Sequence, residues 1–232
     1  MSDYLAEQWQ EVRRRVAEAA RRSGRAPEAV RVVGVTKTVP PEIVREALDL
    51  GLTDFGENRV QEALAKQEVL GRTAASWHLI GTLQTNKARR AAESFTLIHS
   101  LDRWELAEAL DEAGRRLGRP VPVLIQVNVA GEATKHGLPP DQLRPFVRRA
   151  AGLAGLSLAG LMTMAPLAAA AEEARPVFRR LRELFDEAGP DAAAGGTWQW
   201  LSMGMSQDFE VAIEEGANLV RIGTAIFGQR QP

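Results

Sequence analysis

The chain has 232 residues, of which 45% are hydrophobic and 25% charged, as is usual for a soluble globular protein. Its formal net charge of -1 gives no global electrostatic reason to bind nucleic acid or an anionic membrane. The absence of cysteine excludes disulfides, thiolate catalysis and cysteine-based zinc sites, and three histidines in no close pair argue against a histidine-rich metal site. We expect a cytoplasmic protein, because the N-terminus lacks a secretory signal and no apolar stretch is long enough to span a membrane.

A helix is predicted over residues 2–22, because apolar side chains recur there at helical spacing and Ser23-Gly24 follows. Beyond it, apolar strands alternate with amphipathic helices. The predicted strands are 30–37, 53–58, 75–81, 95–100, 120–130, 156–164, 196–205 and 217–223. The predicted helices between them are 41–51, 59–71, 84–94, 103–118, 141–153, 170–189 (with a kink at Pro176) and 206–216, and residues 130–140 form a loop.

This pattern has eight strands, each but the last followed by a helix. Nearly continuous apolar strands separated by helices indicate parallel pairing, buried on both faces. Eight of them fit a closed (β/α)8 barrel, with an open doubly wound sheet as the alternative. We predict one α/β domain over residues 1–232, in which the helix of residues 1–23 packs on the barrel in place of the missing eighth helix.

In such a barrel the functional side chains gather at the C-terminal ends of the strands. The residues expected there are Lys37, Glu57, Asn58, His78, His99, Ser100, Asn128, Met162, Thr163, Ser202, Met203, Gly204, Arg221, Gly223 and Thr224. Lys37 draws attention because it ends the β-branched run VRVVGVTK. It is either a solvated lysine at the edge of the sheet or a desolvated amine, which would be a nucleophile.

The last two strands predict a phosphate site. Gly204 and Ser206 stand where a strand is expected to turn into a helix, whose first N–H groups favour an anion. Gly223 allows close approach of the backbone, and Thr224 adds a hydroxyl. Barrels often bind phosphate between the loops after strands seven and eight. We therefore predict a phosphate cradle built from Ser206, Gly223 and Thr224.

A lysine and a phosphate cradle on one rim suggest pyridoxal 5'-phosphate (PLP), whose aldehyde forms a Schiff base with a lysine amine. Arg221 would then lie near the ring nitrogen. A carboxylate there would keep this nitrogen protonated, whereas a permanently charged arginine disfavours its protonation. The site would hold PLP yet weaken its power to stabilise carbanions.

Six stretches in order, VGVTKTVP, FGENRVQEA, WHLIGTLQTNK, GLMTMAP, LSMGMSQDFEVAIEEG and VRIGTAIFG, resemble the YggS/PROSC-type PLP homeostasis proteins along nearly the whole chain. That family is similar in fold to the barrel domain of alanine racemase, the type III fold of PLP proteins. The resemblance implies that Lys37 carries the Schiff base, that Ser206, Gly223 and Thr224 hold the phosphate, and that Arg221 faces the ring nitrogen. It also suggests that Asn58, His78 and Met162 line the pocket, and that no metal is needed.

The resemblance further implies a protein that buffers or delivers PLP in the cell rather than a robust catalyst. Other B6 vitamers and PLP-dependent apo-enzymes are candidate partners, and the barrel would be a monomer or a weak dimer. A PLP-dependent amino-acid racemase is the alternative. Such an enzyme needs a second base, and the only tyrosine, Tyr4, is expected to lie away from the rim. A third interpretation is a sugar-phosphate barrel in which Lys37 reacts with a carbonyl substrate.

The histidines leave alternatives open. His78 lies in an apolar run, which suits a buried core histidine as well as a ligand contact, and His99 is interpreted as structural or part of the rim. His136 is expected to be exposed in the loop AGEATKHG. This loop could cover the pocket, and Lys135 could then approach the ligand.

Overall fold

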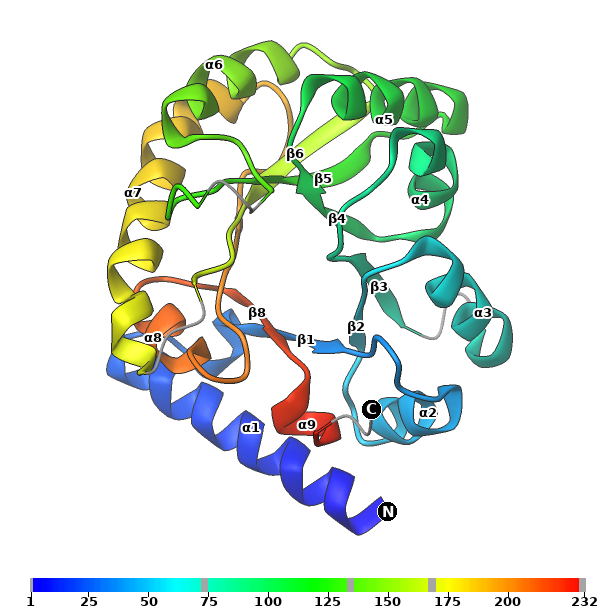
Figure 1. The fold of residues 1–232 in the computed structure, drawn as a ribbon, viewed down its shortest axis with the longest axis vertical. Helices are drawn as coiled ribbons and strands as arrows, with labels where there is room; N and C mark the ends of the chain where they lie inside the picture. The colour runs from blue at the N-terminus through cyan, green and yellow to red at the C-terminus, as the bar shows by residue number, and fades with distance from the viewer. Residues whose placement is uncertain (1, 72–74, 133–135, 167–169, 230–232) are drawn as a thin grey trace.

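The computed structural model describes residues 2–71, 75–132, 136–166 and 170–229, and in it eight parallel strands close into a barrel in sequence order (Figure 1). The strands are β1 (Arg31–Val35), β2 (Asp54–Glu57), β3 (Ser76–Leu79), β4 (Leu97–Leu101), β5 (Val121–Gln126), β6 (Leu156–Met162), β7 (Trp200–Ser202) and β8 (Leu219–Ile222). Pairing of β1 with β8 closes the ring, since Val33 lies opposite Arg221. The predicted barrel is confirmed, and the open doubly wound sheet is excluded.

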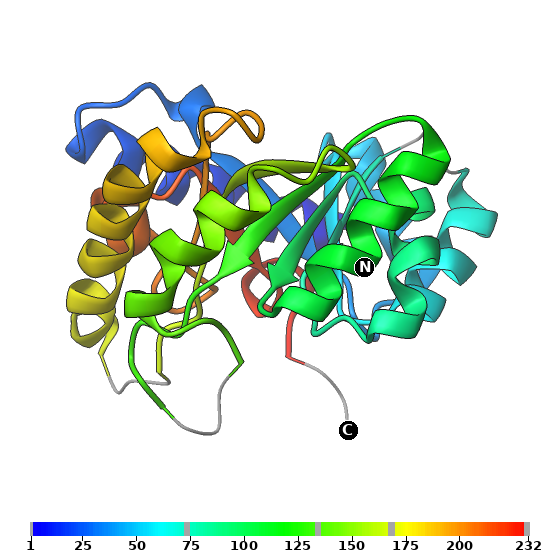
Figure 2. The ribbon, with the colours of Figure 1, turned by 90° about the horizontal axis from the view of Figure 1, so that it is seen from above.

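Helices surround the barrel (Figure 1). They are α1 (Ser2–Arg22), α2 (Pro41–Asp49), α3 (Val60–Leu70), α4 (Ala88–Ser94), α5 (Trp104–Leu117), α6 (Pro140–Ala150), α7 (Arg175–Ala192), α8 (Phe209–Glu214) and α9 (Thr224–Phe227), with 3-10 turns η1 (Pro27–Ala29), η2 (Thr85–Lys87) and η3 (Ala171–Ala174). Figure 2 shows the barrel from the side, with the segments that follow β5, β6 and β8 at one end.

Several elements differ from the prediction. Strand β7 has three residues, because the rest of its apolar run lies in the loops on either side. Helix α8 starts at Phe209 and not at residue 206, since residues 206–208 form a turn. Pro176 does not kink a helix: it lies in the first turn of α7, where a missing N–H is tolerated. Helix α9, a single turn after β8, was not predicted.

Two clusters of apolar side chains stabilise the barrel. Inside it, a small cluster is formed by Val33, Leu97, Leu124, Ala159, Met162 and Leu219. A much larger cluster fills the space between the strands and the helices, where Phe55, Trp77, Phe178 and Phe209 are fully buried. Burial of this apolar surface is the main stabilising term, and it places the polar strand ends around one mouth.

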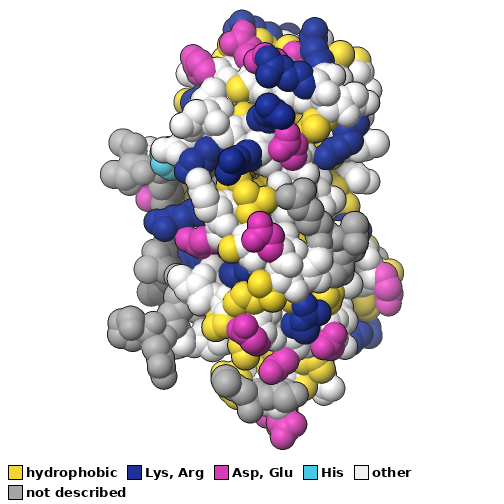
Figure 3. Space-filling model, turned by 90° about the vertical axis from the view of Figure 1, so that its right-hand side faces the viewer, with side chains coloured by type: hydrophobic (Ala, Val, Ile, Leu, Met, Phe, Trp, Pro, Cys, Tyr) yellow, Lys and Arg dark blue, Asp and Glu magenta, His cyan; other side chains and the backbone are white. Residues whose placement is uncertain are grey.

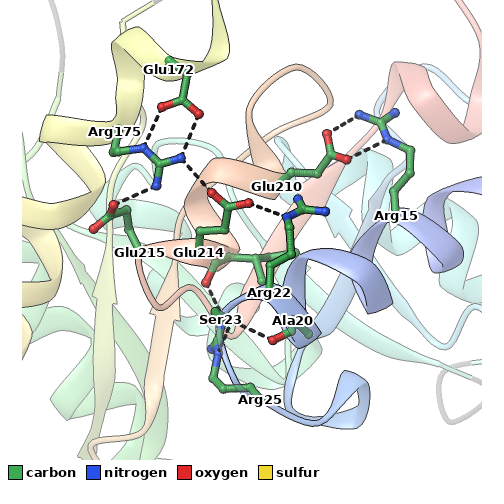
Figure 4. Close-up of polar contacts among 11 residues, drawn as sticks. Arg15, Ala20, Arg22, Ser23, Arg25, Glu172, Arg175, Glu210, Glu214 and Glu215 are labelled. Atoms are coloured by element: carbon green, nitrogen blue, oxygen red, sulfur yellow. Dashed lines mark hydrogen bonds and ion pairs between the residues drawn. The ribbon is translucent and has the colours of Figure 1, made fainter.

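Helix α1 packs against α8 and α9, next to the place where an eighth helix would lie. Its apolar face is buried, with Leu5, Val12 and Val16 at most 5% exposed. The polar side is tied to the barrel by arginine–glutamate pairs, among them Arg15 with Glu210 and Arg22 with Glu214 (Figure 4). Helix α1 thus packs on the outside of the barrel.

The surface charges are mixed. Figure 3 shows Lys and Arg side chains interspersed with Asp and Glu on one face of the molecule. Within the described residues, no helix is both long enough and apolar enough to cross a membrane. The same part of the chain holds no group of three or more metal-ligating side chains of the His, Cys, Asp or Glu type.

Candidate functional site

Two cavities meet at the mouth of the barrel. The larger, of about 550 Å³, is lined by Lys37, Ser206, Arg221, Gly223 and Thr224 from the ends of β1, β7 and β8, as well as by Arg15 of α1. The smaller, of about 250 Å³, shares Lys37 and Arg221 and adds Asn58, beyond β2, together with Thr82 and Gln126. The fold thus brings six of the eight predicted binding residues together.

Lys37 does not belong to β1. The strand ends at Val35, and Lys37 is the second residue of a tight turn, closed by the N–H of Val39, which donates to the carbonyl of Thr36 over 2.9 Å. The next residue, Thr38, has φ +67°, a backbone conformation that is strained for a β-branched side chain. Such strain often marks functional sites. The turn leaves the Lys37 side chain lining both cavities.

Ser206 organises the proposed anion cradle. Its Oγ accepts hydrogen bonds from the N–H groups of Gly223, over 3.2 Å, and of Ala225, over 3.3 Å. Because the oxygen accepts both, its own proton is left to donate. Gly204 makes this approach possible: it has φ +93°, and a side chain there would come within 2.6 Å of Ala212 Cβ. Ser206 acts from a turn and not from a helix N-terminus, which is where the sequence had placed it.

Arg221 supplies a buried positive charge. Its Nη1 donates to Ser202 Oγ over 2.6 Å, and its Nη2 donates to the carbonyl of Thr163 over 2.8 Å. Burial lowers the pKa of Arg221 to about 10, so the guanidinium stays protonated at neutral pH. Asp208 lines the larger cavity, and its Oδ1 accepts a hydrogen bond from the N–H of Met205. Burial raises the pKa of the Asp208 carboxyl.

A chain of buried polar groups continues from Arg221 through the barrel interior. Ser202 Oγ lies 3.1 Å from His99 Nδ1, His99 Nε2 lies 2.9 Å from His78 Nδ1, and His78 Nε2 lies 3.1 Å from Asp54 Oδ1. Arg221 can only donate and an ionised carboxylate can only accept. One arrangement satisfies both ends: every bond runs from Arg221 to Asp54, and each imidazole donates from Nε2–H and accepts at Nδ1.

The pKa values agree with this direction. Burial, together with the nearby charges of His78 and Arg221, holds the pKa of His99 well below its usual value. Burial alone would raise the pKa of Asp54, but the hydrogen bond and charge of His78 lower it overall. Asp54 was not singled out from the sequence. Asp54 is the first residue of β2, where an acidic residue is usually solvated, so no local signal marks it.

The structure does not bring every predicted residue to the cavities. His78 and Met162 are buried in the barrel interior, where His78 contacts Asp54 and His99 and Met162 packs in the apolar cluster. His78 and His99, distant in sequence, are in direct contact. His136 is exposed, as expected. Lys135, predicted to approach the ligand from the loop, lies outside the described residues.

Tyr4 corrects one expectation. Helix α1 places it on a third cavity, of about 840 Å³, which also contacts Lys37 and Thr224. The tyrosine therefore lies beside the rim and not away from it. Tyr4 remains half exposed.

The chain is similar to known proteins over nearly its whole length. Residues 8–231 match the family "Alanine racemase, N-terminal domain". The "Pyridoxal phosphate homeostasis protein" of Aquifex aeolicus (strain VF5) is 46% identical over 94% of this chain and 94% of its own length. PipY of Synechococcus elongatus PCC7942, solved with PLP bound, is 38% identical, covers 97% of this chain and 100% of its own, and superposes with a TM-score of 0.84.

A more distant likeness shows the fold alone. Alanine racemase from Bartonella henselae, solved with covalently bound pyridoxal phosphate, is 14% identical with a TM-score of 0.72, and the match covers 61% of its chain. The match to the homeostasis proteins, by contrast, is close and extends over nearly their full length. This chain belongs to the alanine racemase N-terminal domain family, and within it to the pyridoxal phosphate homeostasis proteins.

Proposed function

We propose that the chain binds PLP at the mouth of the barrel, with Lys37 as the Schiff-base residue, and takes part in PLP homeostasis in the cell. One observation supports this above all: a lysine, a buried arginine and a serine hydroxyl, which is held by two backbone N–H groups, line a single cavity. That donor set matches an aldehyde and a phosphate on one ligand. A relative in the same family is named "Pyridoxal phosphate homeostasis protein".

Each residue has a role in the proposal. Ser206, Gly223 and Thr224 hold the phosphate, and the Ser206 hydroxyl donates to it. Arg221 faces the ring nitrogen, while Asn58 lines the opposite wall. His78 and Met162 support the site from beneath. Bound PLP supplies an electron sink, and a guanidinium that stays charged weakens that sink by disfavouring protonation of the ring nitrogen.

A racemase is less well supported. The match to alanine racemase is to the barrel alone, whereas the homeostasis proteins match over nearly their whole length. A sugar-phosphate enzyme would use the same lysine and cradle, but the family comparison does not favour it. The finer assignments remain part of the proposal: binding of other B6 vitamers, transfer to apo-enzymes, a cytoplasmic location and a monomeric or weakly dimeric state.

The test is an absorbance spectrum of the purified protein with added PLP, followed by borohydride reduction and peptide mass mapping. We expect a Schiff-base band and a reduced adduct on the peptide that contains Lys37. Lys37→Ala should abolish both, because no other amine is assigned this role. Lys87→Ala, which removes a partly exposed lysine on η2, is the matched control and should leave both unchanged. An adduct that persists in Lys37→Ala would refute the assignment.

A further inference from the structure

A buried ion pair lies directly behind the turn that carries Lys37. Lys66, on α3, places Nζ 2.5 Å from Oε1 of Glu57, the last residue of β2. The Lys66 side chain is 9% exposed and that of Glu57 is 0% exposed. Glu57 directly precedes Asn58, which lines the smaller cavity. The pair is therefore one residue away from the rim, although it does not reach either cavity of the mouth.

Two contacts connect this pair to the Lys37 turn. Lys66 Nζ donates to the carbonyl oxygen of Thr36 over 2.5 Å, and Thr36 Oγ1 donates to Glu57 Oε1 over 2.6 Å. The same Thr36 carbonyl accepts the N–H of Val39 that closes the turn. The charged amine thus binds the peptide group that joins Thr36 to Lys37. Movement of Lys66 or Glu57 would move that peptide group.

The pair is poorly explained as a stabilising device. Burying two charges is costly, and a buried pair is often no more stable than an apolar replacement. Glu57 Oε2 is buried and, among the described residues, has no hydrogen-bond partner. The turn beside it includes Thr38 at positive φ, which local preferences disfavour. Contacts from outside the turn must therefore maintain its shape, and the Glu57–Lys66 pair provides them.

We propose that Glu57 and Lys66 are positioning residues, which fix the Thr36–Val39 turn so that the Lys37 amine meets the aldehyde carbon of the ligand. This inference rests on the proposed function. Ligand binding has two parts in this proposal, phosphate binding and Schiff-base formation. The phosphate cradle is built from the residues after β7 and β8, whereas the pair joins β2 and α3 to the Lys37 turn. The pair therefore acts on the direction of the amine, on which formation of the Schiff base depends.

The test compares two ligands. PLP can form the Schiff base, whereas pyridoxine 5'-phosphate has the same ring and phosphate but an alcohol in place of the aldehyde. The double variant Glu57→Gln/Lys66→Met removes both charges together, so no buried charge is left unpaired. We expect its affinity for PLP to fall by about tenfold or more, with slower growth of the Schiff-base band. A misplaced amine forms the Schiff base more slowly and to a smaller extent. Its affinity for pyridoxine 5'-phosphate should stay within about twofold of the parent protein, since the cradle is untouched.

A matched control removes an exposed ion pair from the start of the same helix. Arg59→Met/Glu62→Gln eliminates that pair and should change neither affinity. If the buried double variant does not fold, Thr36→Val, which removes one hydroxyl, should give the same selective loss to a smaller degree. Equal losses for both ligands, or no loss for either, would overturn the proposal. A parent protein that binds pyridoxine 5'-phosphate but never forms the Schiff base would instead refute the role of Lys37 itself.

Discussion

The polar chain places Arg221 and Asp54 at opposite ends of three hydrogen-bonded side chains, Ser202, His99 and His78. In the arrangement that runs from Arg221 to Asp54, each of the three accepts one hydrogen bond and donates the next. A proton added to His99 at Nδ1 would end the hydrogen bond that this atom accepts from Ser202, and would place a further positive charge near Arg221. The arrangement holds the Arg221 guanidinium in place and disfavours a charge on His99.

This residue-scale arrangement predicts a pH-dependent stability. Burial, His78 and Arg221 hold the pKa of His99 well below the ordinary value of 6.5. Below pH 6.5 the unfolded chain takes up a proton that the folded chain refuses, so stability is complete above pH 6.5 and declines as the pH falls toward the folded-state pKa. We expect the free energy of unfolding, from urea denaturation without ligand, to fall by about 1 kcal/mol between pH 6.5 and 5.5.

Variants isolate the contribution of His99. His99→Gln cannot titrate and should flatten this slope, whereas His136→Gln, which changes an exposed histidine, should keep it. Burial raises the pKa of Asp208, so this carboxyl lowers stability as the pH rises, which is opposite to the contribution of His99. Both variants keep Asp208, so its contribution cancels when their slopes are compared. If the two variants showed the same slope, His99 would not be the group responsible.

At this scale the sequence predicts the rim better than the interior. Lys37, Ser206 and Arg221 could be found because each follows, or ends, an apolar strand. The contact between His78 and His99 could not, because it depends on which residues of β3 and β4 face inward at one height of the barrel. The height of a residue in the barrel follows from the register of all eight strands, and a local sequence pattern does not determine that register. Asp54, alone before Phe55, has the pattern of a solvated strand end.

At the scale of elements, the runs of apolar residues overestimate the strands. The run over residues 196–205 yields only Trp200–Ser202 as β7, although single backbone hydrogen bonds continue on either side, from Gln199 N–H to Ala159 and from Met203 N–H to Leu219. The prediction of β1 through Lys37 also fails, because a turn closes after Thr36. Apolar periodicity indicates that residues are buried, and it does not separate strand residues from the buried loop residues around the mouth.

The attachment of α1 to α8 can be tested at the same scale. Arg25, just after α1, donates to the carbonyls of Ile213, Gly216 and Ala217 at the end of α8, where carbonyls lack helical partners. Arg25→Ala should lower the free energy of unfolding by about 1.5–3 kcal/mol, as expected when buried acceptors lose a charged donor. Arg22→Ala removes a more exposed pair with Glu214 (Figure 4) and should lower it by less than about 1 kcal/mol.

Chemical denaturation of both variants decides between two views of this contact. Equal losses would mean that the exposed ion pairs of Figure 4, and not the carbonyl contacts of Arg25, attach α1 to α8. A larger loss for Arg25→Ala would identify it as the link between α1 and the C-terminal end of α8. The buried apolar face of α1 is the same in both variants, so it cannot account for a difference.

For the whole molecule, the buried face of α1 makes it part of the barrel and not an appendage. Val16 is 5% exposed, and its side chain belongs to the same apolar cluster as the outer faces of the strands. Trp9 also donates Nε1–H to the carbonyl of Leu50, at the end of α2. A helix that shares one core with the barrel should unfold with it, because removing the helix would expose that core to water.

We therefore predict one cooperative transition for the full chain. Far-UV circular dichroism, which follows all helices, and tryptophan fluorescence should give the same midpoint in urea. Val16→Ala should lower the free energy of unfolding by about 2 kcal/mol and shift both probes equally, since it leaves a cavity in the shared core. Glu7→Ala, on the exposed face of α1, should shift neither. If Val16→Ala instead produced an early loss of helix signal, with the fluorescence midpoint unchanged, α1 would be a separate folding unit and the interpretation of residues 1–232 as one domain would be wrong.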